Sequence, residues 1–63
     1  MKYSLVGIDG VHDIVEYTAK ALKETGHDEI VDNMRSRALC AADYVTLIYV
    51  CSRYLDIANG EVK

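Results

Sequence analysis

Four side chains in this sequence have the chemistry to bind a soft metal ion: His12, His27, Cys40 and Cys51. Zinc sites gather thiolates and imidazoles around one point, and most of them use close pairs such as CxxC or HxxxH. No such pair occurs here, because each of these residues lies far along the chain from the next. We therefore expect no metal and no cofactor, with both cysteines reduced and acting as small apolar residues.

A cysteine and a histidine that meet in space could instead act as a nucleophile and its base. Such a site also needs a cleft, an oxyanion-stabilising group and a residue that orients the base. The sequence has 63 residues and carries no nucleophile elbow, phosphate loop or paired-carboxylate motif. We expect a protein that is not an enzyme; a compact enzyme using Cys51 or Cys40 with a histidine is the weaker alternative.

The segment GIDG is a candidate ligand loop, formed by Gly7, Asp9 and Gly10. Glycines at the start of a helix allow backbone amides to approach a phosphate. Asp9 would repel an anion, so a flexible turn into the helix explains the same residues. A small-molecule or nucleotide sensor, with its pocket at a subunit seam near this loop, is the alternative function that this segment supports.

Basic residues are sparse, and the only arginines are Arg35, Arg37 and Arg53. The formal net charge is −3. Because affinity for nucleic acid comes largely from counterions released by clustered cations, we do not expect nucleic acid as a partner.

Acidic and tyrosine side chains form a candidate partner surface. Asp28, Glu29 and Asp32 lie close together in the sequence, and the chain has five tyrosines but no Phe or Trp. Tyrosine combines an apolar ring with a polar tip and suits half-buried contact positions. Tyr17 lies on the flank of the first predicted helix and Tyr49 on the polar stripe of the last, so we expect these two at a contact surface.

Charge and hydropathy place the chain among soluble proteins. The longest apolar run, about 44–51, is far shorter than the ~20 residues that span a bilayer. The N-terminus has no signal-peptide pattern. We therefore expect a cytoplasmic protein that contacts no membrane.

Glycine and aspartate divide the single small domain, 1–63, into four segments. Residues 2–8 alternate in a way that favours a short strand. Residues 11–25 have helical periodicity and end before Gly26, a typical C′ glycine. A second helix is predicted over 28–41, with His27 or Asp28 as its cap.

The last segment, 44–58, predicts a helix capped by Asp43 and ended by Asn59-Gly60. Its polar side chains form a narrow stripe, Thr46, Tyr49, Arg53 and Asp56. Its apolar side chains form two stripes: Tyr44, Ile48, Cys51, Leu55 and Ala58, and Leu47, Val50, Tyr54 and Ile57. Residues 44–51 are aromatic and β-branched, so a strand paired with 2–8 is the alternative for that part.

Two apolar stripes on one helix indicate two packing partners. A chain this short buries only about 60% of its unfolded surface and usually needs an additional source of stability. We expect a homo-oligomer, most simply a dimer, with the last helix at its centre. The predicted interface is the second stripe, Leu47, Val50, Tyr54 and Ile57.

Three stretches, GIDG, YTAKALKETGH and DYxxLIxVCxxYLDxAN, resemble a group of very small proteins from bacteria and their phages. The matching residues are Gly7, Asp9, Gly10, Tyr17, Lys20, Gly26, Asp43, Tyr44, Leu47, Val50, Cys51, Tyr54, Leu55 and Asp56. The sequence departs from the group at 11–13 and 40–42. The group has no established activity, so the resemblance implies only a phage or mobile-element origin.

Taken together, these patterns predict a mainly α chain, with a short N-terminal strand followed by three helices in a homo-oligomer. The expected function is non-enzymatic protein–protein interaction, as in a phage or mobile-element inhibitor of a host protein.

Overall fold

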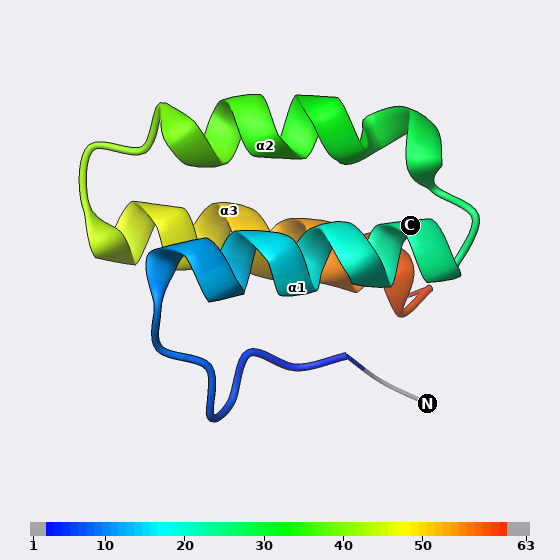
Figure 1. Ribbon diagram of the computed structural model, residues 1–63, viewed down its shortest axis with the longest axis horizontal. Helices are drawn as coiled ribbons and strands as arrows, with labels where there is room; N and C mark the ends of the chain where they lie inside the picture. Colours follow the sequence, from blue (N-terminus) through cyan, green and yellow to red (C-terminus); the bar gives the residue numbers. More distant parts are fainter. Residues whose placement is uncertain (1–2, 61–63) are drawn as a thin grey trace.

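Three α-helices and one short 3₁₀ turn make up the regular structure of residues 3–60, the part that this computed structural model describes. In chain order they are α1 (Val11–Glu24), η1 (Asp28–Ile30), α2 (Val31–Leu39) and α3 (Tyr44–Ala58). The helices run back and forth roughly along one direction, with α1 and α3 side by side and α2 packed against both (Figure 1). The prediction of a mainly helical chain is confirmed.

Local chemistry sets both ends of α1. Gly10 is its N-cap, and the Gly10 carbonyl accepts the Ile14 N–H at 2.8 Å. At the other end Gly26 has φ 82°, and the His27 N–H donates to the Leu22 carbonyl at 2.7 Å. This is the Schellman arrangement, which needs a positive φ that glycine adopts without steric cost. The helix therefore ends at the glycine that the sequence indicates.

The second helix is shorter than the predicted 28–41. Residues 28–30 form the 3₁₀ turn η1, and α2 then covers Val31–Leu39. At its end the Cys40 N–H is shared between the Ser36 and Arg37 carbonyls, both at 3.2 Å. Such sharing tightens the last turn of a helix. The alanines after Cys40 consequently do not extend α2.

The predicted strand over 2–8 is wrong for the described residues 3–8, which contain no strand; Lys2 lies outside the described residues. Gly7 has φ 87°, and the Ile8 N–H donates to the Leu5 carbonyl at 3.1 Å. A positive φ at the third position of a closed turn is typical of a type II turn. This turn interrupts the extended backbone that a strand requires.

Helix α3 spans the residues 44–58 that the sequence predicts, which excludes the alternative strand at 44–51. The Asp43 side chain accepts the Thr46 N–H at 2.8 Å, as expected for its cap. The core combines α3 with the other two helices, and its largest fully buried side chains are Ile14, Leu22, Met34, Thr18 and Cys51.

The buried face of α3 does not follow either predicted stripe alone. Cys51 and Leu55 are buried as expected, but Leu47 and Tyr54 from the other stripe are buried as well. Tyr44, assigned to the core, is 45% exposed. Because α1 and α2 both contact α3, its own chain covers parts of both stripes.

Candidate interaction surfaces

A groove of about 350 Å³ lies between α2 and α3. Its lining contains two arginines, two tyrosines and two aliphatic residues: Arg37, Tyr49, Val50, Arg53, Tyr54 and Ile57. Only Arg37 comes from α2; the others occupy successive turns of α3. The groove thus combines cationic, aromatic and apolar surface.

Contacts within the groove hold several of its side chains in place. The Arg53 guanidinium donates to the Tyr49 hydroxyl at 3.4 Å, and its central carbon lies 5.9 Å from the Tyr49 ring centroid. The Tyr54 hydroxyl donates to the Asn33 side-chain oxygen on α2. Cation–π contact and hydrogen bonding restrict the rotamers of Arg53 and Tyr54.

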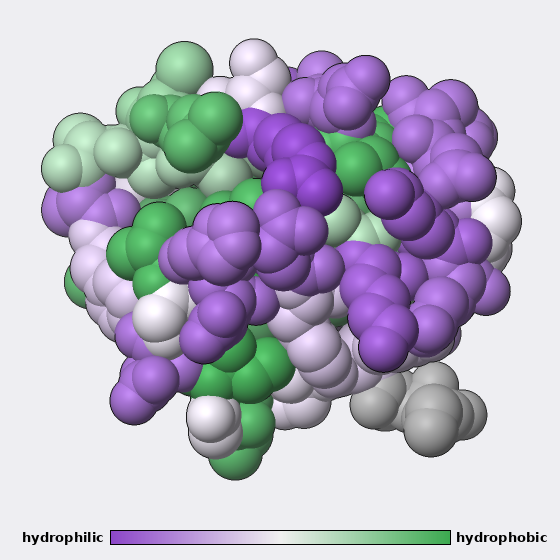
Figure 2. Space-filling model, in the orientation of Figure 1, coloured by the Kyte–Doolittle hydropathy of each residue, from purple (hydrophilic) through white to green (hydrophobic). Residues whose placement is uncertain are grey.

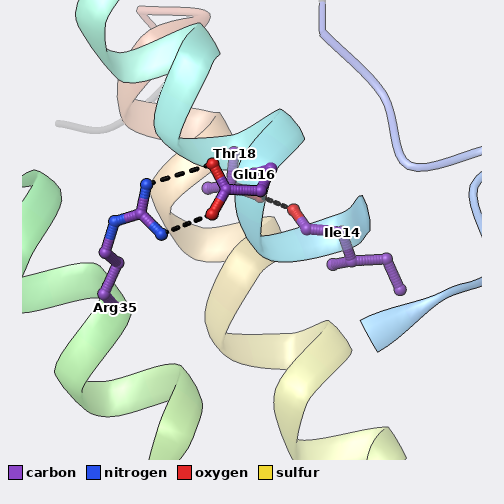
Figure 3. A network of polar contacts seen from close by, with 4 residues as sticks. All are labelled: Ile14, Glu16, Thr18 and Arg35. Carbon is purple, nitrogen blue, oxygen red and sulfur yellow. Dashed lines mark hydrogen bonds and ion pairs between the residues drawn. The ribbon is translucent and has the colours of Figure 1, made fainter. Parts of the chain in front are cut away.

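The remaining arginine, Arg35, has a carboxylate partner. Its two terminal nitrogens donate to the two Glu16 carboxylate oxygens at 2.6 and 3.1 Å, joining α2 to α1 (Figure 3). The hydrogen bond to Arg35 holds the pKa of Glu16 below its ordinary value. Within residues 3–60, by contrast, no ion pair involves Arg37 or Arg53. The groove therefore presents the two arginines that the described chain leaves without a counter-charge.

A second surface lies where α2 ends and α3 begins, and we call it the apolar end. It consists of four large side chains that are substantially exposed: Val11 51%, Leu39 79%, Tyr44 45% and Val45 77%. A hollow of about 230 Å³ opens there, and its lining is mostly apolar with one carboxylate: Val11, Ala38, Leu39, Ala41, Asp43, Tyr44 and Leu47. Hydrophobic side chains also gather over this part of the molecule in the surface view (Figure 2).

The four residues predicted to form the oligomer interface occupy two different environments. Leu47 and Tyr54 are buried within their own chain, in contact with the core. Val50 and Ile57 are half-buried and line the groove. The stripe is therefore divided between core and groove, and the exposed apolar surface lies at the apolar end instead.

The residues predicted as a partner surface lie on different elements: Tyr17 on α1, Tyr49 on α3, and the three acids on η1 and α2. The Tyr17 hydroxyl accepts the Ser4 N–H at 3.1 Å, and its ring packs edge-on against Tyr3 at 6.1 Å. Tyr49 is exposed on α3 and lines the groove. The acids Asp28, Glu29 and Asp32 are exposed on η1 and the first turn of α2. Tyr17 thus holds the N-terminal segment, while Tyr49 remains accessible.

The candidate ligand loop has structural contacts of its own. Gly7 sits in the turn described above and Gly10 caps α1. The carbonyl of Asp9 accepts the Tyr44 hydroxyl at 3.3 Å, which ties the loop to the start of α3. A Cβ added to Gly10 would lie 3.3 Å from the Asp13 carboxylate. Gly7, Asp9 and Gly10 therefore each have a structural role in directing the backbone into α1.

The cysteines and histidines differ in how far they are buried. Cys51 is fully buried, and this burial raises the pKa of its thiol. Cys40 is exposed. His27 lies 2.9 Å from the Thr25 hydroxyl through Nδ1. Among residues 3–60, no three His, Cys, Asp or Glu side chains gather as metal ligands would.

Sequence reasoning missed Arg37 and Leu39. Arg37 lines the groove, and Leu39 is 79% exposed at the apolar end, but neither belongs to a predicted interface. The i,i+4 spacing of Tyr49 and Arg53 on one helix face was the available signal for the groove. Arg37 joins the groove only because α2 packs beside α3, and a local sequence pattern does not predict how two helices pack.

No family model, curated protein or solved structure matches this chain. In the described part of the chain, none of the helices has the length and apolar character needed to cross a membrane.

Proposed function

We propose that this protein is a non-enzymatic interaction protein that associates with a second copy of itself through the apolar end. The observation that supports this function is the exposure of Val11, Leu39 and Tyr44 around one hollow, with exposed Val45 next to Tyr44 in the sequence. Contiguous apolar surface of this kind is costly to leave in water and marks a site of association.

A second copy is the occupant that best suits this surface. A two-fold interface brings the same patch of both chains together, so its residues must be compatible with themselves. Val11, Leu39 and Val45 carry no charge and can meet their own copies without like-charge repulsion. Asp43 also lines the hollow, and its exposed carboxylate must stay in solvent at the rim of such an interface. Burying it would also add to the limited core that 63 residues can form.

The proposed role of the oligomer is to bind another protein, as a phage- or mobile-element-encoded inhibitor of a host protein would. Its support is the resemblance to small bacterial and phage proteins, together with a tyrosine–arginine surface typical of binding sites. An exposed Cys40 remains a thiol most readily in a reducing compartment, which favours the cytoplasm.

Sedimentation of the purified chain at micromolar concentration tests self-association. We expect a mass at least twice the 7.0 kDa of the monomer. Leu39→Asp and Val45→Asp should each give a folded monomer, because these side chains are exposed and their replacement leaves the core intact. Val6→Asp is the matched control, since Val6 is exposed but lies outside the apolar end.

A monomer at every concentration would refute self-association. An oligomer that survives both aspartate substitutions would refute the apolar end as its interface. Helical circular dichroism of each variant separates loss of association from loss of folding.

A further inference from the structure

The groove between α2 and α3 holds positive charge in a chain whose net charge is −3. Arg35 shows how this fold satisfies an arginine, through a two-point ion pair with Glu16. Arg37 and Arg53 line the same groove from different helices, and no described carboxylate pairs with either. Two such cations facing one hollow indicate a ligand that carries negative charge.

We propose that this groove binds an acidic peptide segment of a partner protein. Arg37 and Arg53 would receive its carboxylates, and Val50 and Ile57 would contact an apolar side chain between them. The inference rests on the proposed function as an interaction protein and names the chemistry of its partner.

Arginine geometry favours carboxylates in particular. The planar guanidinium offers parallel N–H donors that match the two oxygens of a carboxylate. Arg53 is held by the Tyr49 hydroxyl and ring, so less side-chain entropy is lost when it binds. Tyr49 itself is exposed and adds aromatic contact area of the type enriched at binding hot spots.

The shape and apolar part of the groove favour a peptide over a small anion. Residues 49–57 of α3 extend about 12 Å along the helix axis, from the rise of ~1.5 Å per residue. An isolated phosphate would use the arginines but leave Val50 and Ile57 uncovered. A peptide with an apolar residue between two acids would cover both kinds of surface, as chains laid in helical grooves do.

Nucleic acid fits this groove less well. Its binding depends on many cations that displace counterions along the backbone. Among the described residues, the groove lining contains two, Arg37 and Arg53.

The test is an NMR titration of the isotopically labelled chain with short peptides in which glutamates flank a leucine. We expect shift changes confined to the backbone amides of residues 49–57, to Arg37 and to the Arg53 side-chain N–H. Replacing the glutamates by glutamine, or the leucine by serine, should weaken binding. Rising salt should also weaken it, because exposed charges are screened.

Substitutions in the groove provide the second readout. Arg37→Gln and Arg53→Gln should each reduce affinity roughly tenfold, the usual effect of losing one charged hydrogen-bonding partner. Arg35→Gln is the matched control, since it removes the same charge from outside the groove and should leave affinity unchanged. Val50→Thr, similar in shape, should weaken the leucine peptide but not the serine peptide.

Several results would overturn the inference: no binding of any acidic peptide, equal binding of the glutamine peptide, or shifts located at the apolar end. Binding of inorganic phosphate or a nucleotide in the groove without the peptide would make it a small-anion site instead. Repeating the titration on Leu39→Asp separates the two proposals. A Leu39→Asp monomer that binds the peptide shows that the groove acts without self-association. A natural chain that is monomeric yet binds contradicts only self-association, and a natural oligomer that does not bind contradicts only the groove.

Discussion

The side-chain amide of Asn59 bonds both backbone groups of Tyr3. The Tyr3 N–H donates to Oδ1 at 2.7 Å, and Nδ2 donates to the Tyr3 carbonyl at 3.1 Å. An amide side chain here supplies the donor and acceptor that a neighbouring strand would otherwise provide. The segment before α1 is thereby attached to the end of α3 without forming a sheet (Figure 1).

Replacing Asn59 by alanine should release this segment while the three helices remain folded. The hydrogen exchange of the Tyr3 amide should become faster, and the ring signals of Tyr3 and Tyr17 should shift as their edge contact at 6.1 Å loosens. Asn59→Asp keeps the acceptor for the N–H but loses the donor to the carbonyl, so an intermediate effect is expected. Unchanged exchange at Tyr3 in the alanine variant would show that the pairing contributes nothing to order.

The contrast between helix ends and the N-terminal segment shows what the sequence predicts well. Gly26 and Asp43 act on backbone groups within a few residues, so their types alone predict where α1 ends and α3 begins. The path of residues 3–8 depends on Asn59, 56 residues after Tyr3. Alternation in KYSLVGI therefore favoured a strand that the turn at Gly7 and this distant amide replace.

The surfaces were harder to predict than the helices for a related reason. Periodicity identified α3 as apolar on two stripes, but the position of α2 decides which residues it covers. Tyr54 is buried and its hydroxyl donates to Asn33 on α2, whereas Tyr44 remains exposed. The groove likewise requires Arg37 from another helix, so composition alone could not place it.

The capping carboxylate of Asp43 should make stability depend on pH. Its hydrogen bond from the Thr46 N–H lowers its pKa below the ordinary 3.8. A lowered pKa in the folded state means that the stabilisation is fully present above the ordinary value and is lost as pH falls through the folded value. Thermal unfolding followed from neutral to acidic pH should show this loss.

Asparagine at position 43 separates the cap from its charge. Asp43→Asn should unfold at a slightly lower temperature near neutral pH and should show a weaker dependence on acid than the natural chain. Asp43→Ala should be less stable than both. Because the pKa of Glu16 is also lowered, Glu16→Gln serves as the control for the remaining acid dependence. Identical acid profiles for Asp43→Asn and the natural chain would contradict this assignment.

The two thiols should differ widely in reactivity. Cys40 is exposed at the end of α2, while Cys51 is fully buried and burial raises the pKa of its thiol. Since the thiolate is the reactive species, a disulfide reagent should modify Cys40 rapidly and Cys51 only when the fold opens. Cys40→Ser should remove the fast phase and Cys51→Ala the slow one. In denaturant the two rates should converge, and equal rates under native conditions would contradict the burial of Cys51.

Two leucines offer a matched comparison of core and surface. Leu22 is fully buried among the three helices, and Leu39 is 79% exposed at the apolar end. Leu22→Ala should lower the free energy of unfolding by about 3 kcal/mol, from lost burial and the cavity left behind. At concentrations low enough to keep the chain monomeric, Leu39→Ala should change the free energy of unfolding by no more than about 0.5 kcal/mol. Urea unfolding followed by circular dichroism measures both.

Protein concentration gives Leu39 a second, distinguishing effect. If the apolar end joins two copies, the urea midpoint of the natural chain rises with concentration, because association stabilises only the folded chain. Leu39→Ala should weaken that rise, whereas Leu22→Ala should lower the midpoint at every concentration. A large loss of stability for Leu39→Ala in the monomer would mean that Leu39 belongs to the core, and the apolar end would then lose its most exposed member.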